Sequence, residues 1–351
     1  MTGFEGAAPA APRHRRLALR RAVFVLAGTG LLAALVVADL LTGPAMLPPG
    51  TVVAALVSPA SADPTAAVIV WDIRLPMTLM AVLVGAMLAT AGVAMQTILA
   101  NPLASPYTLG FSAAAGFGAA AAILTGVALP VLPWLTVPVA AFAAAMVAAG
   151  LVYGFAQMRG MSPEVMVLAG IAALFLFQAL QSMVQYLAAP EVLQAIVFWL
   201  FGSLLKASWS NLPITGAIFL GCAAALVPEL WRLTALRLGD DRAAAIGVEV
   251  RRLRIRIFVL VALLTAGAVA FVGTIGFVGL VAPHVARGLV GEDHRALMPM
   301  AGLSGAVIMV GASVVSKLVA PGTVVPIGIV TAVIGVPFLF GLILRGRRKH
   351  W

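Results

Sequence analysis

The chain has 351 residues and a mean hydropathy of +1.10, with 62% hydrophobic and only 10% charged residues. Soluble domains carry about 25% charged residues, so this chain cannot cover a soluble surface. The composition predicts a polytopic, all-α membrane protein and excludes a secreted enzyme, a cytosolic catalyst and a disordered scaffold. The one cysteine, Cys222, lies in an apolar run, which excludes a disulfide framework and a cysteine-based metal cluster.

About ten apolar stretches are candidates to cross a bilayer, which takes about 20 mostly apolar residues. The first follows five arginines, but it is longer than a signal-peptide core and has no clear cleavage site, so we expect a retained helix. The eighth is short and contains Pro283-His284, which predicts a broken helix. Another apolar stretch, 190–205, has polar flanks and is expected to lie at the membrane surface. The predicted spans are 22–43, 75–100, 107–129, 131–156, 165–187, 211–228, 255–273, 275–290, 297–319 and 326–344.

Basic residues set the orientation, because cytoplasmic loops are enriched in Lys and Arg. With ten spans and both termini inside, nineteen of the 22 Lys and Arg residues are cytoplasmic, and only Arg74, Lys206 and Lys317 are outside. This split explains the formal net charge of +10 without nucleic acid as a partner. We therefore predict one membrane domain, 22–344, between basic cytoplasmic tails at 1–21 and 345–351. The stretch 6–12 is expected to be disordered, and 229–256 to be the largest cytoplasmic segment.

Small and helix-breaking residues recur within the spans. Glycines at 85, 92, 273, 276 and 279 predict close helix packing, or breaks that line a path. Prolines at 102, 106, 283, 326 and 337 interrupt or bound several spans. Gln178, Gln181 and Gln185 share one helix face by spacing and, like Gln96 and Asn101, either line an aqueous path or bond between helices.

Three classes of function can be weighed from the ionisable residues. Ionisable residues within the spans are few, with Asp39 near the outer end of the first span and His284 in the eighth. The lack of an intramembrane carboxylate series disfavours an ion-coupled secondary transporter. No catalytic motif lies within a span, so no catalytic residue or metal ligand is predicted, and an intramembrane enzyme is remote. None of the three lysines lies in a G-x-x-x-x-G-K-[ST] phosphate-binding loop, so any ATP-driven transport needs an ATPase on another polypeptide.

Several long motifs point to one family. They are LVGAMLATAGVAMQTILANPLASPYTLGFS at 83–112, FWLFGSL at 198–204, LRLGDDRAAAIG at 236–247, GTIGFVGLVAPHVARGLVGEDHRALMP at 273–299 and PIGIVTAVIGVPFLFGLIL at 326–344. Together they resemble the FecCD/BtuC-type permeases, the membrane subunits of ABC importers for iron-siderophore, heme and cobalamin. The resemblance covers roughly 70–344, which is nearly the whole membrane domain.

The resemblance implies an assembly of several chains in the cytoplasmic (inner) membrane. This chain would pair with a second permease, identical or paralogous, and with two copies of an ATP-binding subunit. Those subunits would use ATP and Mg²⁺, and this chain would bind no cofactor and would not be an enzyme. A binding protein on the outer face would deliver the substrate, and membrane lipid would surround the permease.

The resemblance also assigns roles to residues. The stretch Leu236–Gly247 looks like the coupling segment that docks into the ATPase, with glycines at its bends. Within it, the residues expected to couple to the ATPase are Leu238, Gly239, Asp240, Asp241, Arg242, Ala245 and Gly247. Arg74 and Lys317 match basic positions that would pair with the binding protein, although Arg74 could instead snorkel at the interface. The residues that would line the path or gate are Gln96, Asn101, Pro102, Ser162, Pro163, Gln178, Gln181 and Gln185. His284 is expected to bond across a broken helix rather than to bind substrate.

Departures from the family pattern cluster on the outer side. Met77 replaces a second arginine, Ser313 an acidic residue, and Val324-Val325 a Glu-Leu pair. These changes leave the coupling interpretation intact and concern the contacts with the binding protein. We predict a ferric-siderophore importer subunit, with cobalamin or heme as the alternative cargo and an ion-coupled secondary transporter as a remote alternative.

Overall fold

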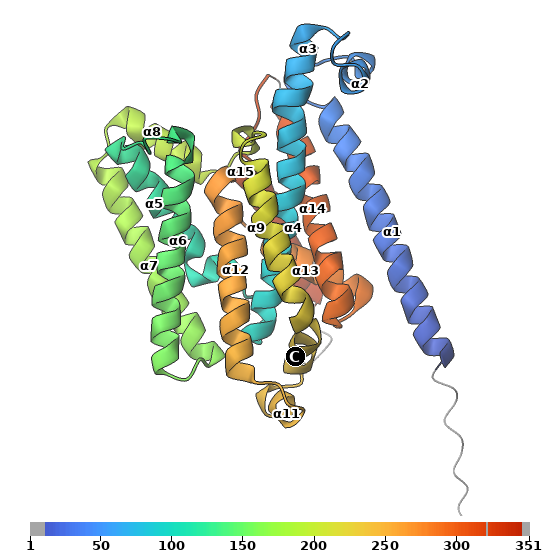
Figure 1. Ribbon diagram of the computed structural model, residues 1–351, viewed down its shortest axis with the longest axis vertical. Coiled ribbons are helices and arrows are strands. Elements are labelled where there is room, and N and C mark those ends of the chain that lie inside the picture. The colour runs from blue at the N-terminus through green and yellow to red at the C-terminus, as the bar shows by residue number, and fades with distance from the viewer. Residues whose placement is uncertain (1–10, 321, 346–351) are drawn as a thin grey trace, which may run out of the picture.

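The computed structural model describes residues 11–320 and 322–345, and these residues form a bundle of helices without a strand (Figure 1). The first half contains α1 (Ala11–Leu41), α2 (Pro49–Val57), α3 (Pro64–Val68), η1 (Ile69–Arg74), α4 (Leu75–Ile98), η2 (Pro106–Leu109), α5 (Phe111–Thr125), η3 (Pro133–Leu135), α6 (Thr136–Met158) and α7 (Pro163–Leu187). The second half contains α8 (Pro190–Leu200), η4 (Leu204–Lys206), α9 (Leu212–Leu226), η5 (Val227–Glu229), α10 (Leu230–Leu236), α11 (Asp240–Ala245), α12 (Val250–Val272), α13 (Val278–Val290), α14 (His294–Leu318) and α15 (Ile327–Arg345).

Seven helical stretches are long and apolar enough to cross a membrane: Ala18–Leu41, Pro64–Ile98, Pro133–Met158, Pro163–Leu187, Leu212–Leu236, Val250–Val272 and His294–Leu318. The other three predicted spans correspond to the shorter apolar helices α5, α13 and α15, so the count of ten stays a prediction. The predicted surface helix is α8, which lies across one end of the bundle (Figure 1).

Two predicted boundaries differ from the structure at the cytoplasmic end. Helix α1 begins at Ala11, so the arginines that precede the first predicted span already lie on helical turns. Residues 1–10 of the predicted tail 1–21, residues 346–351 of the predicted tail 345–351, and most of the stretch 6–12 lie outside the described residues. The predicted cytoplasmic segment 229–256 is not one loop, because α10, α11 and the start of α12 at Val250 together occupy most of it.

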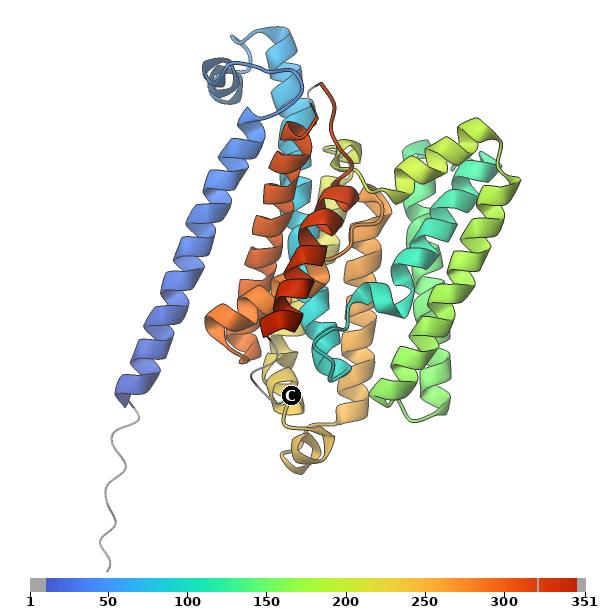
Figure 2. The same ribbon diagram turned by 180° about the vertical axis from the view of Figure 1, so that it is seen from behind.

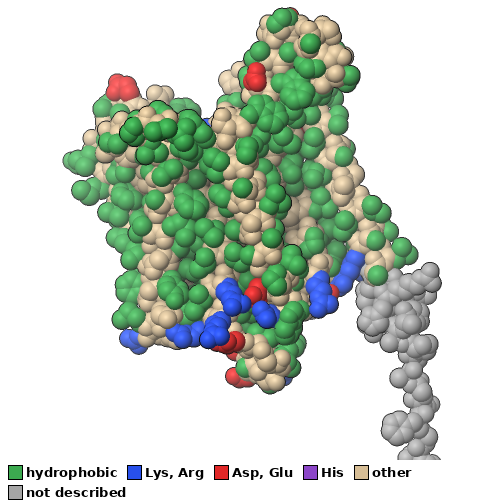
Figure 3. Space-filling view, viewed as in Figure 1, with side chains coloured by type: hydrophobic (Ala, Val, Ile, Leu, Met, Phe, Trp, Pro, Cys, Tyr) green, Lys and Arg blue, Asp and Glu red, His purple; other side chains and the backbone are tan. Residues whose placement is uncertain are grey.

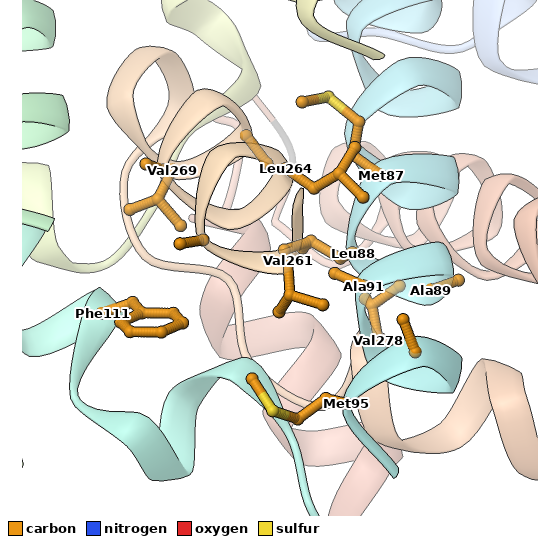
Figure 4. Close-up of a cluster of buried hydrophobic side chains, with 14 of the residues drawn as sticks. Met87, Leu88, Ala89, Ala91, Met95, Phe111, Val261, Leu264, Val269 and Val278 are labelled. Carbon is orange, nitrogen blue, oxygen red and sulfur yellow. The ribbon is translucent and has the colours of Figure 1, made fainter. Parts of the chain in front are cut away.

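Helix α4 is the central element of the bundle. It packs against α12, α13 and α14, and the side chains of its second half are almost all buried. Figure 4 shows Met87, Leu88 and Met95 of α4 facing Val261 of α12, with Phe111 of α5 nearby. The helix can be hydrophobic all round because it is surrounded by protein on most sides.

Glycines set the closest helix contacts, as their spacing predicted. A Cβ atom added at Gly92 of α4 would overlap the carbonyl oxygen of Gly279 in α13. A Cβ at Gly85 would likewise overlap the carbonyl of Gly305 in α14. Small residues let the backbones of membrane helices touch, and here they join α4, α13 and α14 into one tightly packed unit.

The eighth predicted span contains a non-helical segment at 273–277, beside the predicted glycines, followed by the 13-residue helix α13. The break predicted at Pro283-His284 is wrong: α13 continues through Pro283, which removes only one backbone hydrogen bond there. Irregular backbone inside a membrane protein needs internal hydrogen bonds. The hydroxyl of Thr274 donates to the carbonyl of Leu200, and the amide of Ser203 donates to the carbonyl of Val272 at 2.6 Å. The broken segment is therefore bonded to the stretch that follows α8.

Basic residues gather at one end of the bundle, at the bottom of Figure 3. Helix α1 begins and α15 ends at this same end, where α11 also lies (Figures 1 and 2). This distribution follows the positive-inside rule and marks this end as the cytoplasmic one.

Candidate functional site

The predicted coupling segment forms the tip of the cytoplasmic end. Helix α11 lies below the bundle between α10 and α12 (Figure 1). Ala243 is fully buried and anchors the helix, whereas Leu238 and Ile246 are 57% and 56% exposed. Asp241 and Arg242 are also exposed. An apolar pair with adjacent charges is thus presented to any protein that docks from the cytoplasm.

Two glycines shape the bends around α11, as predicted. Gly239 precedes the helix with φ 98° and ψ 157°, and Gly247 follows it with φ 88°. Residues with a side chain rarely adopt the first of these conformations. No neighbouring atom lies near the position of a Cβ at either glycine, so the requirement for glycine comes from the backbone alone.

Arg254 of α12 joins α11 to the cytoplasmic end of α4. Its guanidinium donates to both carboxylate oxygens of Asp240, at 2.8 and 2.7 Å, and its Nε donates to the carbonyl oxygen of Ile98 at 3.1 Å. The Arg254 side chain is only 7% exposed. Two parallel N–H···O bonds to a carboxylate fix orientation as well as distance, so α11 and the end of α4 are held by one rigid group.

A second arginine makes a parallel connection. Arg287 of α13 donates from Nη2 to Oε1 of Gln96 and from Nε to Glu292, both at 2.9 Å. Arg237, at the end of α10, pairs with the same Glu292 carboxylate. The predicted path residue Gln96 is therefore linked through Arg287 and Glu292 to Arg237, which directly precedes the exposed part of the predicted coupling segment.

A cavity of about 520 Å³ lies between these elements. Its lining includes Gln96, Asn101 and Pro102, which were predicted as path residues, and Gly239 and Asp240, which were predicted for coupling. The structure thus brings two separately predicted groups to one place. His284, also in the lining, bonds through Nδ1 with the carbonyl of Leu280 at 2.9 Å. Both residues lie in the continuous helix α13, so this bond does not cross a break as predicted.

The remaining predicted path residues lie elsewhere, on α7. The hydroxyl of Ser162 accepts from the amide of Val165 and caps α7, and Pro163 occupies the first turn. Gln178 is exposed, and Gln181 faces Gly116 of α5. Neither these residues nor Gln185 line the cavity at Gln96. Their role in a path or gate stays a prediction.

The structure corrects the expectation that Arg74 and Lys317 present free charges on the outer face. They are only 3% and 5% exposed. The ammonium of Lys317 lies 2.8 Å from Oδ1 of Asp39 and donates to the Asp39 carbonyl at 2.9 Å. Thr78 donates to Oδ2 of Asp39 at 2.6 Å, and Arg74 donates to the carbonyl of Leu40 at 2.8 Å. These groups fasten α1 to α4 and α14, which is a structural role; contact with a binding protein stays a prediction.

The third outward cation, Lys206, is the exposed one. Its ammonium lies 5.1 Å from the centroid of the Trp199 ring, a cation–π arrangement. Partial burial lowers the pKa of Lys206 to about 8. Lys206 lines a pocket of about 490 Å³ together with Trp134 and Asn211.

Comparisons with known proteins agree with these features. The model of the FecCD transport family matches residues 31–345. The chain belongs to this family. It is 38% identical to the cobalamin import permease of Halobacterium salinarum, over 81% of this chain and 75% of that protein. It is also 38% identical to an Fe(3+)-citrate import permease of Bacillus subtilis, over 80% of this chain and 82% of that protein. A solved inward-facing structure of an ABC transporter, assigned to the metal-chelate type, matches with a TM-score of 0.81 and 33% identity, over 91% of this chain and 98% of that one.

The FecCD family consists of membrane permease subunits of ABC importers, whose ATPase is a separate subunit. As a member, this chain is a multi-pass inner-membrane protein of an importer class that carries metal chelates. The all-helical fold expected from the sequence is confirmed by the structural match.

Sequence reasoning missed the arginines that organise the site of this FecCD member. Arg254 was counted only as a cytoplasmic charge, although Leu253, Ile257 and Phe258 place it on the buried face of α12 at helical spacing. A lone arginine on an apolar face is the pattern that could have found it. Arg287 lies within a quoted motif, but its partner Gln96 is 191 residues away, which no local pattern reveals.

Removing the carboxylate of Asp39 tests the structural role of the outer cluster. We expect Asp39→Ala to lower the free energy of unfolding by about 3–5 kcal/mol, because Lys317 would remain buried without its counter-charge. The double variant Asp39→Leu/Lys317→Met should recover most of the loss, since an apolar pair needs no compensation. Denaturant unfolding of the purified chain in micelles measures both. Unchanged stability of Asp39→Ala would contradict the structural role.

Proposed function

We propose that this FecCD member is the permease subunit of an ATP-driven importer that moves a ferric siderophore, delivered by an extracytoplasmic binding protein, into the cell. The observation that carries the proposal is a set of hydrogen bonds that links α11 to α4. Asp240 of the exposed helix α11 bonds to Arg254, and Arg254 bonds to the carbonyl of Ile98 in α4. This arrangement gives a docking surface for an ATPase and a physical connection from that surface to the transmembrane core.

In the proposed mechanism the ATP-binding subunits pull or push α11 when they close on ATP. Asp240 transmits the displacement to Arg254, and Arg254 transmits it to the last turn of α4 at Ile98. Gln96 lies half a turn earlier on the same helix, at the cavity and in contact with Arg287. Movement of this end of α4 would change the shape and polarity of the cavity, and with it cytoplasmic access to the path.

The substrate assignment rests on chemistry and on relatives. A large chelate that already satisfies its metal needs a wide path with few strong contacts, and the described residues contain no group of His, Cys, Asp or Glu that could hold a metal ion. Relatives of similar identity carry Fe(3+)-citrate or cobalamin, which supports a metal chelate as the cargo. Cobalamin or heme is the alternative cargo for the same mechanism.

The proposed assembly contains a second permease, two ATP-binding subunits and the binding protein. Because Arg74 and Lys317 are buried and bonded, Lys206 is the outward cation free to meet an acidic side chain of the binding protein. Charges at the rim of an interface affect the rate and orientation of docking more than affinity, so Lys206 would guide the binding protein rather than hold it alone.

Substituting Arg254 tests the connection. We expect Arg254→Lys to reduce substrate uptake by about tenfold or more, because a lysine cannot reproduce the forked bonds to Asp240 together with the bond to Ile98. Basal ATP hydrolysis of the assembled transporter should stay near normal, which separates loss of coupling from loss of folding. Arg251→Lys, at an exposed position of the same helix, is the matched control. Normal uptake by Arg254→Lys would refute the connection.

Uptake of radio-iron tests the cargo. Cells with and without this gene would receive ⁵⁵Fe as hydroxamate or catecholate siderophore complexes, with labelled cobalamin and heme in parallel. Loss of one iron complex is the expected result. Loss of cobalamin or heme uptake alone would keep the mechanism and replace the cargo, whereas no change for any compound would contradict the importer itself.

The lowered pKa of Lys206 predicts a pH dependence of docking. The ammonium is protonated below a pH of about 8 and neutral above it, so association of the binding protein should slow as the pH rises from 7 to 9. Lys206→Arg should remain fast at pH 9, because arginine stays charged. Stopped-flow association with the reconstituted transporter measures this, and identical pH profiles for both proteins would exclude Lys206 from docking.

A further inference from the structure

An apolar crevice lies on the side of the bundle between α1 and α9. Its volume is about 400 Å³, within the range of about 300–1,000 Å³ typical of small-molecule sites. The floor is the seam between α4 and α14, where Ala86, Gly302 and Ala306 leave space because their side chains are small. Leu32 of α1 and Ala223 of α9 form the two walls.

The crevice opens sideways to the bilayer. Helix α1 packs on α14, while α9 packs on α4 and α12, so the α4–α14 seam lies between them. The floor residues are buried, but Val227 on the rim is 64% exposed and Pro299 is exposed as well. All four helices belong to membrane-crossing stretches, so the opening faces lipid rather than water.

Two side chains mark the cytoplasmic end of the crevice. Arg295 precedes Pro299, Gly302 and Ala306 by four, seven and eleven residues, which places it on the same face of α14. Its side chain is exposed, and no carboxylate of the described residues lies within ion-pair distance of it. Trp231 follows the lining residue Leu230 and is 41% exposed, in keeping with tryptophan at the headgroup level of a membrane.

We propose that this crevice binds one anionic phospholipid, with an acyl chain on the α4–α14 seam and the phosphate at Arg295. Basic groups beside clefts between transmembrane helices on the cytoplasmic side bind anionic headgroups. The apolar lining suits a hydrocarbon chain and gives water too few polar partners. The site does not depend on the cargo or on the coupling mechanism.

The floor of small side chains along the α4–α14 seam suits a thin and flexible occupant. A flexible hydrocarbon chain can follow the narrow seam, and its headgroup would reach the level of Trp231 and Arg295.

Native mass spectrometry of the purified full chain tests the proposal, with phosphatidylglycerol and phosphatidylcholine titrated separately. We expect the wild-type chain to prefer phosphatidylglycerol. Arg295→Gln should weaken its binding about fivefold, the effect of one basic residue on an anionic lipid, and leave phosphatidylcholine unchanged. The matched control is Arg159→Gln, which removes an exposed cytoplasmic arginine at the end of α6.

A second pair of variants tests the acyl chain. Ala223→Phe should fill the crevice and reduce binding of both lipids, whereas Ala225→Phe, at an exposed position on the other side of α9, should not. Thermal unfolding would confirm that each variant is folded. Equal binding of both lipids by the wild-type chain, normal binding by Ala223→Phe, or displacement of phosphatidylglycerol by inorganic phosphate alone would overturn the proposal.

Discussion

A buried guanidinium inside a membrane bundle must find its hydrogen-bond acceptors within the protein, because water cannot reach it at low cost. Arg254 meets this constraint with the carbonyl of Ile98 and the carboxylate of Asp240. The requirement joins the end of α4 to α11 and α12, which lie about 150 residues later in the chain. The position of α11 against the bundle depends on this interaction more than on packing, because only Ala243 of that helix is buried.

A buried cation pairs with a carboxylate at each end of the bundle, and the two pairs differ in how exposed the carboxylate is. On the outer side Asp39 is fully buried beside Lys317, so separating them would leave two unpaired charges in the interior. On the cytoplasmic side Arg254 is buried but Asp240 is 49% exposed. Water can solvate that carboxylate if the pair separates. The outer cluster is therefore a fixed anchor for α1, whereas the cytoplasmic pair can transmit a displacement or release it.

Much of the fold could be predicted from the sequence, because the length of an apolar stretch indicates a membrane span and the distribution of Lys and Arg indicates its orientation. The break before α13 was predicted from its glycines, whereas Pro283 lies inside that helix. The bends at Gly239 and Gly247 were predicted from their positions around a short helical stretch. The burial of Arg74 and Lys317 was not predicted. Asp39, the partner of Lys317, lies on α1, 278 residues earlier in the chain, and Arg74 donates to the neighbouring carbonyl of Leu40. Only the three-dimensional packing shows that both cations are buried.

The glycine contacts explain how a movement at one turn of α4 could reach the rest of the membrane domain. Gly92 lies against the backbone of Gly279, and Gly85 against that of Gly305. Backbones in direct contact have no flexible side chains between them to absorb a shift. A displacement received at Ile98 would therefore carry α13 and α14 with α4. Because Arg287 lies on α13 and bonds to Gln96, the sides of the cytoplasmic cavity that α4 and α13 form would move with this unit.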